Sequence, residues 1–182
     1  MTHITKLSSL FIGISFSLRL HTPIAFGICI FTGILLMLFD NKQNIKKFLK
    51  LENSFTKLTE VDVIIICLPT PLDKIKRPDL SYIEKNFKEI FPYLRKYQAI
   101  ILESTSYPGT TRQVYEKKLK TKFKIGKDFK LIFSPEREDP GRRDFVQENV
   151  PKIVSGYSKS CLLTGKLINS IIYKKVIPVE SL

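Results

Sequence analysis

The chain has 182 residues, of which 43% are hydrophobic and 26% charged, the profile of a folded globular domain rather than a disordered chain. This length suffices for one ordinary domain with a core and is short for two. Lys and Arg number 30 against 17 Asp and Glu, a formal charge of +13 that would suit an anionic partner. The basic residues are scattered and mostly Lys, without a zinc, RGG or helix-turn-helix signature, so no nucleic-acid partner is expected.

The three cysteines and two histidines offer no metal or disulfide pattern. Cys29, Cys67 and Cys161 are far apart in apolar surroundings and have no CxxC spacing. His3 and His21 have no evident partner in the sequence, so no metal site is predicted. Buried free thiols in a reducing compartment are expected, which favours a cytoplasmic location.

The stretch 21–39 contains no charged side chain and supports two interpretations. About twenty apolar residues span a bilayer, so the stretch could be a transmembrane helix that makes the protein membrane-associated. Alternatively, it is a strand, helix and strand buried in an α/β core, with breaks at Gly27 and Gly33 and a last strand ending at Asp40. The sequence leaves both interpretations open.

From Val61 onward, apolar runs alternate with helical patterns. A β-branched run over 61–68, stopped by Pro69, predicts a buried strand. Further strands are predicted at 99–102, 129–133, 153–154 and 175–179, and helices after the N-cap candidate Asp79, from about Arg112, and over 161–173. This alternation predicts an α/β fold with a doubly wound, Rossmann-like parallel sheet.

The helical patterns also predict which side chains are buried. The first helix repeats apolar residues at helical spacing and carries Pro92 late, where proline bends or shortens a helix. The residues predicted to face inward are Ile83, Phe87, Ile90 and Leu94 in the first helix, Val114 and Leu119 in the second, and Leu162, Leu163, Leu167 and Ile171 in the third.

Parallel pairing would bring three loops to one edge of the sheet. They are 70–71, 104–111 and 135–141, which together carry hydroxyls, carboxylates and backbone N–H groups. Open α/β sheets bind ligands outside the carboxyl ends of their strands. A nucleotide pyrophosphate is the natural ligand for backbone donors at helix starts.

Four motifs then resemble the UDP-glucose/GDP-mannose dehydrogenase family over about two-thirds of the chain. They are VDVIIICLPTPL (61–72), ESTSYPGTT (103–111), SPEREDPG (134–141), and PKIVSGYS leading into KKVIPVES. The Glu-Arg-Glu-Asp-Pro-Gly version of the third motif is most similar to UDP-N-acetylglucosamine 6-dehydrogenases. The resemblance implies NAD as cofactor, a UDP-sugar as substrate, and oxidation of the sugar C6 alcohol to the uronic acid for polysaccharide biosynthesis.

The resemblance also implies roles for individual residues. Thr105 would hydrogen-bond near the reacting centre, and Glu136 would position water and move protons at C6. The alternatives are that Thr70 and Thr105 cap helices and that Glu136 pairs with Arg137 or Arg142. The residues implied in cofactor binding are Gly13, Asp40, Pro69, Thr70, Pro71 and Ser104.

The chain departs from the family pattern at its start and lacks its second half. Of the family's GxGYVG turn only Gly13 is present, and Ser15 stands where the second glycine should lie beside the diphosphate. We therefore expect residues 1–60 to be a degenerate start and 61–182 the remainder of an NAD-binding domain. The central helix, the Gly-Gly-x-Cys motif and the C-terminal UDP-sugar domain are not in the sequence, and Cys161 does not replace the catalytic thiol.

Three hypotheses follow from these departures. The chain is a truncated or split UDP-sugar dehydrogenase whose second half is a separate polypeptide, or a non-catalytic nucleotide-binding remnant. The third is a membrane-anchored interaction protein that uses 21–39 as its span.

Overall fold

The structure is a computed structural model that describes residues 54–135, 151–171, 173–180 and 182. Its strands are β1 (Val63–Ile66), β2 (Gln98–Leu102), β3 (Phe129–Phe133), β4 (Lys152–Gly156) and β5 (Val176–Val179). Its helices are η1 (Phe55–Glu60), α3 (Ser81–Ile90), η2 (Phe91–Tyr93), the π-helical turn η3 (Arg112–Glu116), α4 (Lys117–Leu119) and α5 (Lys159–Asn169). The predicted strands are confirmed within a few residues, whereas the stretch 21–39 lies outside the described residues.

The described strands form one sheet in the order β1-β2-β3-β4-β5. β1 pairs with β2, β2 with β3, and β4 with β5 in parallel, as predicted. β3 and β4 pair antiparallel, with Ile132 opposite Gly156 and Phe133 opposite Ser155, so the sheet is mostly parallel and the predicted parallel pairing fails only for these two strands. Because β4 runs antiparallel to β3, it begins at the end of the sheet at which β3 stops, and antiparallel neighbours need no crossover helix.

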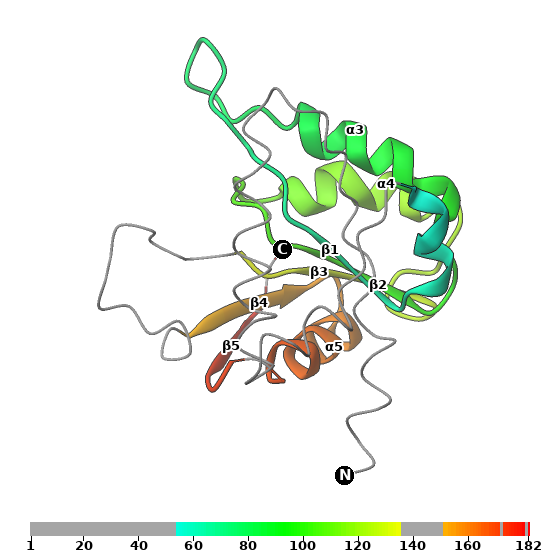
Figure 1. The fold of residues 1–182 in the computed structure, drawn as a ribbon. Helices are drawn as coiled ribbons and strands as arrows, with labels where there is room; N and C mark the ends of the chain where they lie inside the picture. The colour runs from blue at the N-terminus through cyan, green and yellow to red at the C-terminus, as the bar shows by residue number, and fades with distance from the viewer. Residues whose placement is uncertain (1–53, 136–150, 172, 181) are drawn as a thin grey trace, which may run out of the picture.

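Helices cover both faces of the sheet (Figure 1), which confirms the doubly wound α/β layering. α3 and α4 lie on one face and α5 on the other. Because neighbouring strand residues point to opposite faces, Ile100 and Leu131 join the core under α3 and α4, whereas Ile101 and Ile132 join the core under α5.

The first helix follows its sequence pattern closely. Ile83, Phe87 and Ile90 are buried, as predicted. The Asp79 carboxylate accepts the backbone N–H of Ser81 at 2.9 Å, although the helix boundary itself falls at Leu80. That hydrogen bond lowers the pKa of Asp79. Helix α3 stops at Ile90, and the proline-containing turn η2 follows, so the proline shortens the helix.

The buried face of α5 differs from the prediction. Leu163, Leu167 and Ile171 are exposed, and Leu162 is only half-buried. The residues that pack against the sheet are Cys161, Gly165, Ile168 and Asn169. A Cβ at Gly165 would lie 2.7 Å from Ile132 Cγ2 and 2.8 Å from Val154 Cγ1, so the helix lies close to the sheet on its small-residue face. Helix α5 buries this small-residue face because it allows the helix to approach the sheet closely, and the leucine-rich face stays exposed.

Two smaller predictions also need correction. In the second helix Leu119 is buried as predicted, but Val114 is half-buried and Tyr115 is the fully buried neighbour. Cys161 is a buried free thiol as expected, whereas Cys67 is only half-buried, and Cys29 lies outside the described residues.

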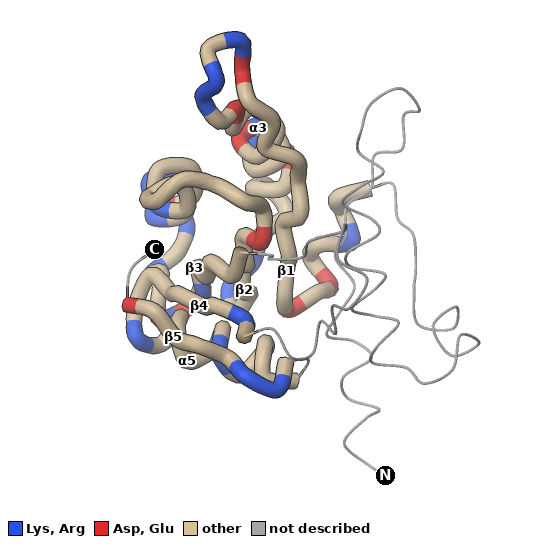
Figure 2. The backbone as a smooth tube through the Cα atoms, turned by 90° about the vertical axis from the view of Figure 1, so that its left-hand side faces the viewer, with Lys and Arg blue, Asp and Glu red and all other residues tan. Residues whose placement is uncertain are grey.

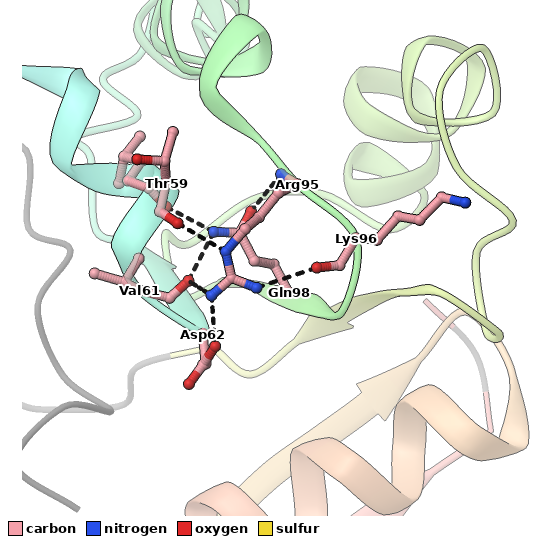
Figure 3. Close-up of polar contacts among 7 residues, drawn as sticks. Thr59, Val61, Asp62, Arg95, Lys96 and Gln98 are labelled. Atoms are coloured by element: carbon pink, nitrogen blue, oxygen red, sulfur yellow. Dashed lines mark hydrogen bonds and ion pairs between the residues drawn. The ribbon is translucent and has the colours of Figure 1, made fainter.

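At the amino ends of β1 and β2, a polar network ties η1 to the sheet (Figure 3). The Arg95 guanidinium donates to Thr59 O at 2.7 Å and Val61 O at 3.0 Å and pairs with the Asp62 carboxylate at 2.6 Å. The fully buried Gln98 amide donates to the carbonyls of Leu58 at 2.6 Å and Val61 at 2.7 Å. The network satisfies carbonyl groups that η1 leaves unpaired where it ends.

The charged residues are spread over the described surface. Figure 2 shows Lys and Arg on the loop before α3, on α4 and around β5, with fewer Asp and Glu between them. No helix in the described part of the chain combines the length and apolar character that crossing a membrane requires.

Candidate functional site

The candidate site is the edge of the sheet at which β1, β2 and β3 end, here called the carboxyl edge. Its segments are Cys67–Pro71 after β1, Glu103–Thr111 after β2, and Ser134–Pro135 after β3. Since the three strands pair in parallel, these segments emerge side by side.

The first two segments are joined by hydrogen bonds. The backbone N–H of Leu68 donates to Ser104 Oγ at 2.7 Å, and the hydroxyl of Thr70 donates to the carbonyl of Thr105 at 2.5 Å. The backbone N–H groups of Glu103 and Ser104 both reach Ile66 O, at 2.9 and 3.3 Å. Three of the residues predicted from the sequence, Thr70, Ser104 and Thr105, therefore lie together, and Pro69 and Pro71 flank Thr70 in the chain.

The third segment is anchored at its base. The backbone N–H of Ser134 donates to Leu102 O at 3.0 Å, and its hydroxyl donates to Ile153 O at 3.0 Å. Ser134 is fully buried. The predicted residues Glu136, Gly13 and Asp40 lie outside the described residues, and their placement stays a prediction.

The turn after Thr105 requires a glycine. Gly109 has φ of +89°, a conformation that residues with a Cβ rarely adopt. The backbone N–H and the hydroxyl of Thr110 both donate to Tyr107 O, at 3.2 and 2.7 Å, and close the turn before η3. The Pro-Gly-Thr-Thr part of the motif therefore shapes the loop, and the hydroxyls of Thr105 and Ser106 before it are left for a ligand.

The carboxyl edge also holds a buried ion pair that the sequence did not predict. Lys152 Nζ lies 3.3 Å from Glu103 Oε1, and the two side chains are only 3% and 7% exposed. Glu103 Oε2 accepts from the thiol of Cys67 at 3.6 Å. A signal was present in the sequence, because Lys152 directly precedes the strand residues Ile153 and Val154, where a charge is unexpected unless it has a partner.

The chemistry of these groups suits a polar nucleotide ligand. The segments offer the hydroxyls of Thr70, Thr105 and Ser106, and Ser106 Oγ is buried with no hydrogen-bond partner in the described part of the chain. An unpaired buried hydroxyl is costly unless a ligand or a small rearrangement satisfies it. Among the residues that the structure describes, no group of His, Cys, Asp or Glu is arranged to hold a metal ion.

A sheet with helices on both faces, whose parallel strands end in Ser- and Thr-rich loops, defines a Rossmann-like nucleotide-binding domain. The family model described as "UDP-glucose/GDP-mannose dehydrogenase family, NAD binding domain" matches residues 34–177. The chain belongs to this family, and its cofactor class is NAD. The resemblance seen in the four sequence motifs is thereby confirmed.

Curated relatives agree with this assignment. The chain is 34% identical over 134 residues to a UDP-N-acetyl-D-glucosamine 6-dehydrogenase of Pseudomonas aeruginosa, covering 69% of this chain and 30% of that protein. It is 37% identical over 109 residues to Protein CapL of Staphylococcus aureus, covering 58% of this chain and 25% of that protein. The chain thus spans less than a third of the length of these relatives.

Solved structures show the same fold. The UDP-N-acetyl-mannosamine dehydrogenase Cap5O of S. aureus superposes with a TM-score of 0.66 at 27% identity, covering 76% of this chain and 35% of Cap5O. An NDP-N-acetyl-D-galactosaminuronic acid dehydrogenase of Methanosarcina mazei superposes with a TM-score of 0.68 at 26% identity, covering 76% of this chain and 31% of that one.

Proposed function

We propose that this chain is the NAD-binding part of an NAD-dependent UDP-sugar 6-dehydrogenase acting on UDP-N-acetylglucosamine or a related UDP-sugar. The observation that carries the proposal is the joining of the Thr70 and Ser104–Thr105 segments at the carboxyl edge, within a chain of this family. Residues 1–60 form the start of the domain and 61–182 its remainder. The chain spans 30% of the length of its P. aeruginosa relative, and a separate polypeptide would carry the sugar-binding half.

The residues at the carboxyl edge would have separate roles in binding and catalysis. When bound, NAD accepts the hydride from the sugar C6 carbon. Thr70, between Pro69 and Pro71, and Ser104 line the cofactor, and Gly13 and Asp40 hold its pyrophosphate and adenosine ribose. Thr105 offers a hydroxyl near the reacting carbon, and Glu136 takes up the proton released there. Because the Thr70 hydroxyl donates to Thr105 O, the loop after β1 and the loop after β2 are linked at this edge.

Titration with NADH tests cofactor binding directly. We expect enhanced NADH fluorescence that excess NAD reverses. Thr70→Val removes the hydrogen bond to Thr105 O and should weaken NADH binding several-fold. Thr121→Val is the matched control, because its hydroxyl donates to Lys118 O on the surface, away from the carboxyl edge. No NADH binding by the wild-type chain would refute the proposal.

Mixing tests the catalytic part of the proposal. The chain combined with a polypeptide carrying the second half of a UDP-N-acetylglucosamine 6-dehydrogenase should form NADH from UDP-N-acetylglucosamine and NAD. Neither polypeptide should do so alone, because the Gly-Gly-x-Cys motif and the loops of the carboxyl edge then lie on different molecules.

A second candidate function is nucleotide binding without turnover. It is favoured by the sequence, in which Ser15 occupies the position of the second glycine of the family's GxGYVG turn. NADH binding together with an inactive mixture supports this candidate, and NADH formation by the mixture excludes it. Ser15→Gly should tighten NADH binding if that side chain crowds the diphosphate.

A further inference from the structure

The buried pair of Lys152 and Glu103 is not explained by stability alone. Lys and Glu are almost never fully buried unless they are paired, and these two side chains are 3% and 7% exposed. A buried ion pair is weak evidence for stability, because the cost of removing both charges from water offsets their attraction. The placement of the pair therefore calls for another reason.

The pair lies across the end of β3. Glu103 is the first residue after β2, and Lys152 is the first residue of β4. Because β4 runs antiparallel to β3, which lies between β2 and β4, the start of β4 is at the carboxyl edge. Lys152 is further held by its backbone N–H, which donates to Lys175 O at 2.9 Å, and its ammonium lies 5.1 Å from the centre of the Tyr173 ring.

Glu103 connects Lys152 to the segment after β1. Its other carboxylate oxygen accepts from the Cys67 thiol, and its backbone N–H is bound to Ile66 O. The next two residues contact the segment after β1. Ser104 Oγ accepts from the backbone N–H of Leu68, and the carbonyl of Thr105 accepts from the Thr70 hydroxyl. A shift of Glu103 therefore displaces both contacts that join the two loops.

We infer that Lys152 and Glu103 form a positioning pair that holds the Cys67–Thr70 and Ser104–Thr105 loops in the arrangement that binds the dinucleotide. The inference rests on the proposed function, since it assigns the ligand of the same edge. Both side chains are buried, so their effect on affinity would pass through Ser104, Thr105 and Thr70. A lysine or carboxylate that merely stabilised the fold would change NADH affinity only as far as it changed the folded fraction.

Four variants separate positioning from stability: Lys152→Met, Lys152→Arg, Glu103→Gln and the double variant Lys152→Met/Glu103→Gln. NADH affinity is measured by fluorescence titration well below the melting midpoint of each variant, and stability by urea unfolding. Lys152→Met leaves a buried carboxylate without this ammonium, and we expect about tenfold weaker NADH binding together with lower stability. Lys152→Arg keeps the charge and should bind within about threefold of the wild type.

The double variant gives the distinguishing result. It removes both buried charges, so stability should recover, whereas NADH binding should stay about tenfold weaker because the link between β4 and β2 is gone. Gln98→Leu is the control, since it removes a buried polar side chain at the opposite edge. It should lower stability and leave the NADH dissociation constant within about twofold.

Recovery of both stability and affinity in the double variant would overturn the inference, and so would unchanged NADH affinity in Lys152→Met. Failure of the proposed function is recognised separately, because it appears as absent NADH binding in the wild-type chain. In that case the inference fails with it.

Discussion

Replacing Gln98 by leucine tests whether the polar network at the amino edge stabilises the fold. The side chain is fully buried, and its amide donates to Leu58 O and Val61 O while its carbonyl accepts from Arg95 N at 2.8 Å. In the variant, Val61 O still accepts a hydrogen bond from the Arg95 guanidinium, but Leu58 O and Arg95 N lose their hydrogen bonds to the Gln98 side chain. Each orphaned buried group costs about 1–3 kcal/mol, so we expect a loss of about 3 kcal/mol in the free energy of unfolding.

Urea unfolding followed by circular dichroism measures this loss. The matched control is Gln113→Leu, the same chemical change at an exposed side chain that contacts only the Tyr107 hydroxyl among the interactions described. The control should stay within about 0.5 kcal/mol of the wild type. If Gln98→Leu costs no more than Gln113→Leu, the network does not stabilise the fold and the reasoning is refuted.

The remaining predictions concern packing and titration. A Cβ at Gly156 would lie 2.2 Å from the backbone nitrogen of Leu162, so Gly156→Ala should cost about 2 kcal/mol or more in urea unfolding, and a neutral result would contradict this packing. On α5, Ile168→Ala should cost about 2–4 kcal/mol and Leu167→Ala less than about 0.5 kcal/mol, and equal losses would contradict the observed helix face. Burial raises the pKa of the Tyr115 phenol above its ordinary value of 10.0. The unfolded chain therefore loses this proton first, and the stability that Tyr115 contributes below about pH 10 decreases as the pH rises further. Tyr115→Phe should weaken that alkaline decrease and cost little at neutral pH, because the hydroxyl has no hydrogen-bond partner in the described part of the chain.

The family could be assigned from the sequence because its motifs are short and lie at strand ends. A β-branched run indicates a strand, and a proline indicates where it stops. The residues just beyond the strand are those that a nucleotide ligand contacts. The meeting of the 70–71 and 104–111 loops followed from the predicted parallel strands, and the structure shows Thr70 and Thr105 in contact.

By itself, the sequence determined the positions of the strands, the buried face of α3 and the family, because these depend on local patterns along the chain. The tertiary structure decided which face of α5 is buried, since close approach at Gly165 outweighs the leucine pattern. It also decided the direction of β4, because strand direction depends on where the chain re-enters the sheet. The pairing of Glu103 with Lys152 followed from that direction, because only an antiparallel β4 brings its first residue to the edge where β2 ends.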